Sequence, residues 1–117
     1  MNKHLAVAIY LIMDITWIVY NEKFYNENIK KIQNKDIKLK KIPALIAYSL
    51  LILNIYMLLI PNLKNSLEYS LSGLVIYGVY NMTNLATIDK YPIDMVIKDS
   101  LWGTFSHFVL GSMIFLI

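Results

Sequence analysis

The sequence contains no cysteine and no arginine, and only four glycines and three prolines among its 117 residues. The absence of cysteine excludes a disulfide framework, a thiolate nucleophile and a cysteine-bound metal. All eleven basic residues are lysines, so no guanidinium is available to bind a phosphate or a guanine through paired hydrogen bonds. We therefore expect no nucleic-acid partner, despite the net charge of +3.

Apolar residues, by contrast, make up 57% of the chain, which is more than soluble domains usually contain. They are concentrated in four runs, and each run approaches the ~20 residues that a helix needs to cross a bilayer. Asp14 interrupts the first run and no cleavage site follows it, so we interpret this run as a retained span rather than a signal peptide. The sequence predicts an all-α integral membrane protein, a single domain over residues 1–117. Its fold would be an antiparallel up-down bundle of four transmembrane helices at about residues 4–20, 43–60, 67–86 and 95–117.

The lysines are distributed unevenly between the polar breaks. Most lie in the first break, residues 21–42, and Lys90 and Lys98 flank the third, whereas only Lys3 and Lys64 fall on the other side. Short lysine-rich loops stay cytosolic. We therefore expect a multi-pass protein with its first and third loops in the cytosol and both termini outside.

The first break also contains apolar residues at helical spacing, namely Tyr25, Ile29 and Ile32. This pattern favours a short basic amphipathic helix lying on an anionic leaflet, and a solvated basic connector is the alternative. The lysines expected to contact lipid headgroups are Lys30, Lys31, Lys35, Lys38, Lys40 and Lys41.

Two carboxylates interrupt the apolar runs, and a charge inside a bilayer requires a partner or water. Under the proposed topology, Asp14 lies about 9 Å from the cytosolic end of its helix and Asp99 about 6 Å into the last helix from the same side. Amides near the inner end of the third run reach the same depth. The sequence predicts a shared intramembrane polar cluster formed by Asp14, Asn81, Asn84 and Asp99, to which the resemblance described below adds Thr83.

Other residues on the same helical faces extend this interpretation. Candidates for lining a pathway are Tyr10, Asn54, Tyr77 and His107, and candidates for helix packing and anchoring are Trp17, Trp102 and Gly103. Simpler interpretations stay open at each position. Asp99 could reach headgroup water, Asp14 could serve only to fix helix packing, and His107 could be a packed histidine rather than a proton relay.

Several motifs resemble one family. The stretch from Tyr80 to Thr87, the later Asp99 to Thr104, and the early Asp14, Trp17 and Phe24-Tyr25 are similar to the signature of the domain of unknown function 2177 family. This resemblance covers nearly the whole chain. It implies a small four-span membrane protein of a kind found in bacteria and some large DNA viruses. The chain is rich in lysine, isoleucine and asparagine, as expected from an AT-rich genome, which is compatible with a viral origin.

The resemblance further implies that one common site contains Asp14, Thr83, Asn84, Asp99, Trp102 and Gly103. The sequence departs from the family pattern at Asn81, where the family usually carries an aspartate, so this position offers an amide instead of a carboxylate. The resemblance implies no activity.

Three functions compete. The leading hypothesis is a structural, assembly or partner-docking membrane component whose partners are the bilayer and a second copy or another membrane protein. The alternative is a proton-coupled carrier or channel for a small solute, formed as a dimer. An enzyme that uses the two aspartates as acid and base is disfavoured, because no metal cluster, activated serine or phosphate-binding loop accompanies them. We thus predict no catalytic residue, no cofactor and no metal.

Overall fold

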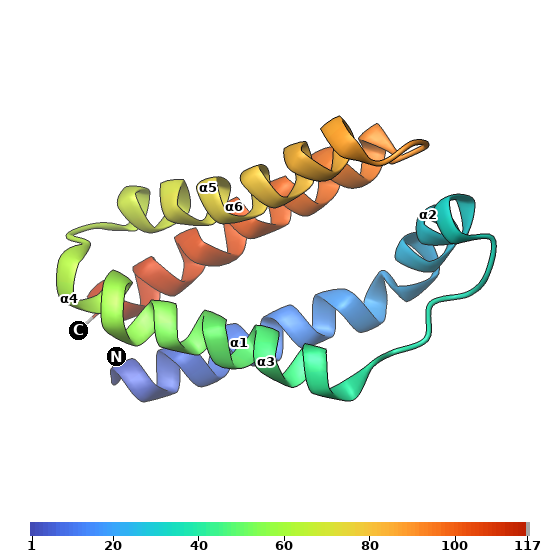
Figure 1. The fold of residues 1–117 in the computed structure, drawn as a ribbon. Helices are drawn as coiled ribbons and strands as arrows, with labels where there is room; N and C mark the ends of the chain where they lie inside the picture. Colours follow the sequence, from blue (N-terminus) through green and yellow to red (C-terminus); the bar gives the residue numbers. More distant parts are fainter. Residues whose placement is uncertain (117) are drawn as a thin grey trace.

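All regular structure within residues 1–116, the part of the chain that a computed structural model describes, is helical (Figure 1). The expectation of an all-α fold is confirmed. Each apolar run forms a long helical segment, the first break forms an additional helix, and Ile117 lies outside the described residues. The elements are α1 (Lys3–Tyr20), α2 (Glu22–Gln33), α3 (Lys41–Asn54), the π-helical η1 (Ile55–Leu59), α4 (Ile60–Asn62), α5 (Ser66–Thr87) and α6 (Ile93–Phe115).

Asparagines mark several helix ends. The Asn2 side chain accepts hydrogen bonds from two backbone N–H groups in the first turn of α1, and Asn65 accepts one from Glu68 at 2.9 Å in the first turn of α5. Asn34 ends α2 in a left-handed conformation, with φ 60°. These are the positions at which a short amide side chain satisfies free backbone groups or tolerates positive φ.

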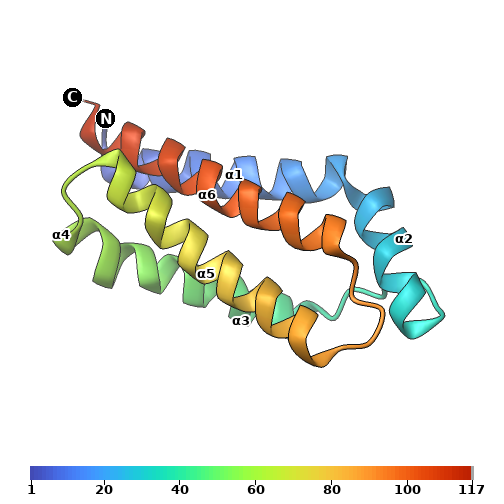
Figure 2. The same cartoon turned by 90° about the horizontal axis from the view of Figure 1, so that it is seen from above.

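The long helices form two layers, with α5 and α6 in one layer and α1 and α3 in the other (Figures 1 and 2). Both termini lie at the same end of the molecule, where the Met1 ammonium donates a hydrogen bond to the Leu116 carbonyl. At the opposite end lie α2, the connection from α2 to α3, and the turn between α5 and α6. This arrangement brings the predicted first and third loops to one end.

Two apolar clusters occupy opposite ends of the structure. The cluster near the termini joins α1, η1, α5 and α6 through the buried side chains of Tyr10, Ile55, Tyr69 and Leu110. The other cluster forms where α2 covers the start of α6, around Met95. Asp14 and Asp99 fall between these clusters along α1 and α6, so the structure places a polar layer between two apolar ones.

The helices α5 and α6 approach each other most closely at glycines. A Cβ atom on Gly73 would collide with the carbonyl oxygen of Gly103, and a Cβ atom on Gly103 would collide with the Tyr77 ring. Only a residue without a side chain fits at these positions, as is common where membrane helices pack.

The outer faces of the helices are apolar. None of the residues in α3 is buried, and large side chains such as Leu45, Leu50 and Leu53 are more than half exposed. Among the described residues, two helical segments are long and apolar enough to cross a membrane, namely Lys3–Tyr20 and Lys41–Asn62. An apolar exterior of this extent is typical of a surface that faces lipid or another protein.

Candidate functional site

Asp14 is the most deeply buried carboxylate in the described chain, with 4% of its surface exposed. Its Oδ2 accepts a hydrogen bond from the Tyr48 hydroxyl at 2.7 Å, and its Oδ1 accepts one from the Trp102 indole Nε1 at 2.9 Å. Because Tyr48 lies on α3 and Trp102 on α6, this single carboxylate connects α1 to two other helices.

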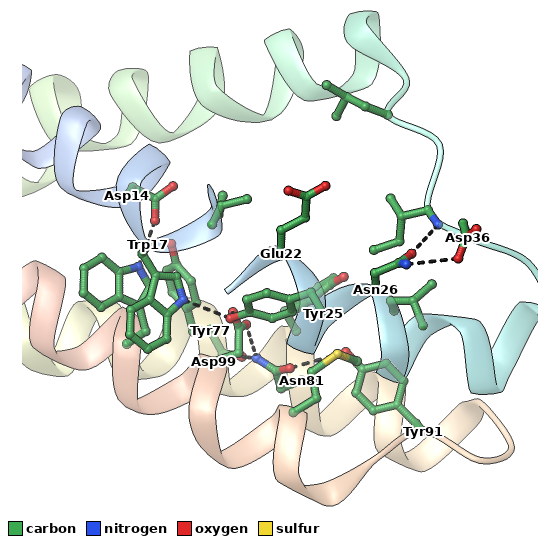
Figure 3. Close-up of a pocket in the computed structure, with 17 residues that line it drawn as sticks. Asp14, Trp17, Glu22, Tyr25, Asn26, Asp36, Tyr77, Asn81, Tyr91 and Asp99 are labelled. Carbon is green, nitrogen blue, oxygen red and sulfur yellow. Dashed lines mark hydrogen bonds between the residues drawn. The ribbon is translucent and has the colours of Figure 1, made fainter. Parts of the chain in front are cut away.

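Asp99 makes the corresponding contacts from α6. Its Oδ1 accepts a hydrogen bond from the Tyr25 hydroxyl of α2 at 2.9 Å, and its Oδ2 accepts one from Nδ2 of Asn81 in α5 at 2.7 Å (Figure 3). Burial, opposed by the hydrogen bond from Trp17, raises the pKa of Tyr25 above its ordinary value. The phenol therefore stays protonated and can donate to the carboxylate.

The two tryptophans of the chain link these carboxylate groups. The rings of Trp17 and Trp102 are stacked, with centroids 4.4 Å apart and an angle of 3° between their planes. Trp17 donates to the Tyr25 hydroxyl at 3.1 Å, and Tyr25 in turn donates to Asp99. A continuous set of hydrogen bonds and ring contacts thus runs from Asp14 to Asp99.

Asn81 extends the cluster toward the turn between α5 and α6. Its side chain is fully buried, and Nδ2 also donates to the backbone carbonyl of Tyr77 at 2.8 Å. The Tyr91 hydroxyl donates to Oδ1 of Asn81 at 3.4 Å and accepts from Asn84 at 3.3 Å. Burial raises the pKa of Tyr91, which keeps this hydroxyl protonated as a donor.

A cleft of about 670 Å³ opens beside this cluster, at the end of the molecule that carries α2 (Figure 3). Four carboxylates line it, from Asp14, Glu22, Asp36 and Asp99, and no lysine does. The aromatic residues of its wall are Trp17, Tyr25, Tyr77, Tyr80, Tyr91 and Trp102. We call this feature the acidic cleft.

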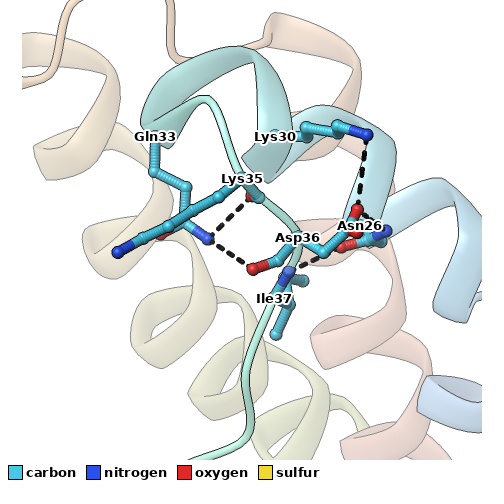
Figure 4. Close-up of polar contacts among 6 residues, drawn as sticks. All are labelled: Asn26, Lys30, Gln33, Lys35, Asp36 and Ile37. Carbon is cyan, nitrogen blue, oxygen red and sulfur yellow. Dashed lines mark hydrogen bonds and ion pairs between the residues drawn. The ribbon is translucent and has the colours of Figure 1, made fainter.

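The connection between α2 and α3 forms part of the wall of the acidic cleft. It folds back onto α2, where Asn26 donates to Asp36 at 3.0 Å and accepts from the backbone N–H of Ile37 at 2.7 Å (Figure 4). Lys30 lies 3.5 Å from the same carboxylate. The hydrogen bond from Asn26, and then the charge of Lys30, hold the pKa of Asp36 below its ordinary value. We call residues 35–39 the strap.

Several residues singled out from the sequence lie away from the cleft. Tyr10 and His107 are fully buried nearer the termini, with ring centroids 5.4 Å apart, and His107 Nδ1 lies 2.9 Å from the Gly103 carbonyl. Within residues 1–116, neither His107 Nε2 nor Nδ2 of Asn54 has a hydrogen-bond partner. Thr83 is exposed on the outer side of α5 and does not line the cleft.

The lysines expected to contact headgroups are all exposed: Lys30, Lys31, Lys35, Lys38, Lys40 and Lys41. Sequence reasoning missed the tyrosines that donate to the polar cluster, Tyr25, Tyr48 and Tyr91. Their positions carry a weak signal, because tyrosine suits both an apolar wall and a hydrogen bond.

Helices with an apolar exterior and carboxylates between them are typical of a helical membrane protein. The chain belongs to the family described as "Predicted membrane protein (DUF2177)", whose model matches residues 3–116. Neither a curated protein nor a solved structure matches the chain.

Proposed function

We propose that this chain is a four-span membrane protein in which the two aspartates fasten the helices together, as a structural, assembly or partner-docking component. The observation that carries the proposal is the pairing of each carboxylate with donors from two other helices. Interhelical hydrogen bonds of this kind are worth about 1 kcal/mol each in membranes, and they specify which helices pair.

Helix lengths and charge support four spans. The segments α1, Lys41–Asn62, α5 and α6 contain 18, 22, 22 and 23 residues, close to the ~20 that cross a bilayer. The lysine-rich strap and the turn that carries Lys90 lie at the same end, away from both termini. In our proposal this end faces the cytosol, and the exposed lysines contact anionic headgroups.

Single cysteines test this topology cleanly, because the chain has none of its own. We expect a membrane-impermeant maleimide to label Lys64→Cys from outside intact cells and to label Lys35→Cys only after the cells are opened. Labelling of both variants from the same side would contradict the arrangement of four spans.

A double-mutant cycle tests whether Asp14 fastens the helices. Asp14→Ala, Tyr48→Phe and the double variant are compared by their free energies of unfolding in detergent, with Tyr20→Phe, an 87% exposed tyrosine, as the control. We expect a coupling energy of about 1 kcal/mol between Asp14 and Tyr48 and no effect of the control. Strictly additive effects at residues 14 and 48 would remove the basis of the proposal.

The acidic cleft favours a second candidate, a proton-coupled carrier or channel for a small solute. The cleft reaches both Asp14 and Asp99 from the end that we assign to the cytosol. Toward the termini, however, the path is closed by the fully buried Tyr10 and His107, so transport would require rearrangement or a second copy packed on the exposed face of α3. Purified protein in vesicles should then show flux that depends on a pH gradient and is lost in Asp14→Asn. If the vesicles show no such flux, the structural role remains the only candidate.

A further inference from the structure

The acidic cleft contains four carboxyl groups, and the described chain supplies an ion-pair partner to one of them. Among the four carboxylates that line it, only Asp36 lies within ion-pair distance of a lysine in residues 1–116, namely Lys30. Asp14 and Asp99 accept hydrogen bonds only from neutral groups, the phenols, indole and amide described above. The buried Asp14 and the partly buried Asp99 therefore have hydrogen-bond donors but no lysine within ion-pair distance.

Such an arrangement favours a cation supplied from outside. A carboxylate that is removed from water loses several kcal/mol of solvation, which neutral donors offset only in part. Each carboxylate offers about four acceptor positions, and the chain occupies two of them on Asp14 and two on Asp99. Both residues line the cleft, so a cation that enters it has access to each carboxylate.

The aromatic wall indicates which kind of cation fits. Aromatic faces attract ammonium groups within about 6 Å of the ring centre. The chain already uses this attraction beside the cleft, where the Lys98 ammonium lies 4.1 Å from the Phe24 centroid and 5.6 Å from the Trp17 centroid. Within the described residues, no group of three or more histidine, aspartate or glutamate side chains could hold a metal ion.

We propose that the acidic cleft binds a small organic ammonium ion, held by Asp14 and Asp99 and enclosed by the surrounding aromatic rings. The volume of about 670 Å³ falls within the range of roughly 300 to 1,000 Å³ that is typical of small-molecule sites. The ammonium group could belong to a free amine or to an amine-bearing lipid headgroup. The proposal needs only the cleft and holds whether or not the protein transports its ligand.

The protein contains its own reporter for this binding. Trp17 and Trp102 are its only tryptophans, and both line the cleft, so all tryptophan fluorescence originates there. We would titrate the full chain, purified in a sugar-headgroup detergent, with tetramethylammonium chloride. Sodium chloride controls for ionic strength, and tert-butanol is a neutral analogue of similar shape. We expect a saturable change in emission with tetramethylammonium alone.

Matched variants show whether the carboxylates bind the probe. Asp99→Asn should weaken binding of tetramethylammonium by about tenfold, the loss expected for a partly buried charged partner. Asp94→Asn removes the same charge from an exposed position on α6 outside the cleft, and binding should be unchanged. Glu22→Gln alters an exposed carboxylate of the cleft wall and should weaken binding about threefold.

Circular dichroism shows whether each variant retains its helices. If Asp99→Asn does not fold, the comparison of Glu22→Gln with Asp94→Asn decides the question. The proposal is overturned if tetramethylammonium produces no saturable change, if tert-butanol produces an equal one, or if Asp94→Asn weakens binding as much as the variants of the cleft.

Lipid nanodiscs distinguish the two sources of the ammonium group. If a headgroup is the natural occupant, phosphatidylcholine should compete with tetramethylammonium. The apparent affinity should then be weaker in phosphatidylcholine discs than in phosphatidylglycerol discs, with both affinities expressed in terms of the probe concentration at the disc surface. Equal affinity in both would indicate a free amine. Either result supports an ammonium site, whereas binding in neither kind of disc would contradict it.

Discussion

Between α5 and α6 close contacts are made at glycines, whereas α3 is joined to α1 through the side chain of Tyr48. At Gly73 and Gly103 the facing helix lies so close that a Cβ atom on either glycine would collide with it. In α3, residues 41–54, no residue is buried. The Tyr48 hydroxyl donates a hydrogen bond to Asp14 of α1. The α5–α6 pair should behave as a rigid unit, and α3 as the part that can move away from it.

The largest expected effect on stability comes from disrupting the packing between α5 and α6. Gly103→Ala would place a methyl carbon within collision distance of Cγ of Tyr77, so the Tyr77 side chain or one of the two helices must shift. We expect the free energy of unfolding in detergent to fall by about 1 to 3 kcal/mol or more. Gly78→Ala is the matched control on α5, because its nearest neighbour outside the helix backbone is the flexible end of Leu74 at 3.9 Å.

At Gly78 the same substitution should leave stability unchanged or raise it by up to about 1 kcal/mol, because alanine is the better helix former. If Gly78→Ala and Gly103→Ala destabilised the protein equally, the loss would come from the helix backbone and not from packing. The proposed difference in rigidity between the α5–α6 pair and α3 would then lose its main support.

An intermediate effect is expected from releasing α3. Asp14→Ala removes the acceptor for Tyr48 and Trp102, and each donor left without a partner costs about 1 kcal/mol or more. We expect α3 to move outward while α5 and α6 stay together. Spin labels on cysteines at Ser49 and Phe108 should show a longer and broader distance distribution in this variant.

The control pair for that measurement places labels at Leu71 and Phe108, on α5 and α6. Its distance should not change in Asp14→Ala, because the glycine contacts do not depend on the carboxylate. Equal broadening for both pairs would mean that Asp14 stabilises the whole molecule and not the attachment of α3.

The same contrast explains how much of the structure could be predicted from the sequence. Long apolar runs predict helices because both the lipid-facing and packed sides of a membrane helix are apolar. The π-helical turn at Ile55–Leu59 was not predicted, because its residues are as apolar as the rest of the run. It lies just before Pro61, a residue without an N–H group. Asp14, Asn81 and Asp99 were identified because polar residues inside apolar runs need partners.

The partners themselves could not be identified. Tyr25, Tyr48 and Tyr91 belong to a chain with nine tyrosines, and nothing local distinguishes those that donate to a carboxylate. Thr83, which the family resemblance grouped with the cluster, shows how helical geometry separates residues that are close in sequence. Residues advance about 100° around a helix per position, so Thr83 points about 200° away from Asn81 and faces outward.

The smallest expected effect concerns the strap, whose attachment to α2 rests on exposed side chains. Because the pKa of Asp36 is lower in the folded protein than its ordinary value of 3.8, ionised Asp36 stabilises the strap above that value. The stabilisation is lost as the pH falls through the lower, folded pKa. A spin label on Lys38→Cys should therefore be restrained at neutral pH and become more mobile below about pH 4. Adding Asp36→Asn should give a label whose mobility no longer changes over this range, whereas Asp94→Asn should not alter the response. A label equally mobile at every pH in the parent protein would show that ionised Asp36 does not hold the strap on α2.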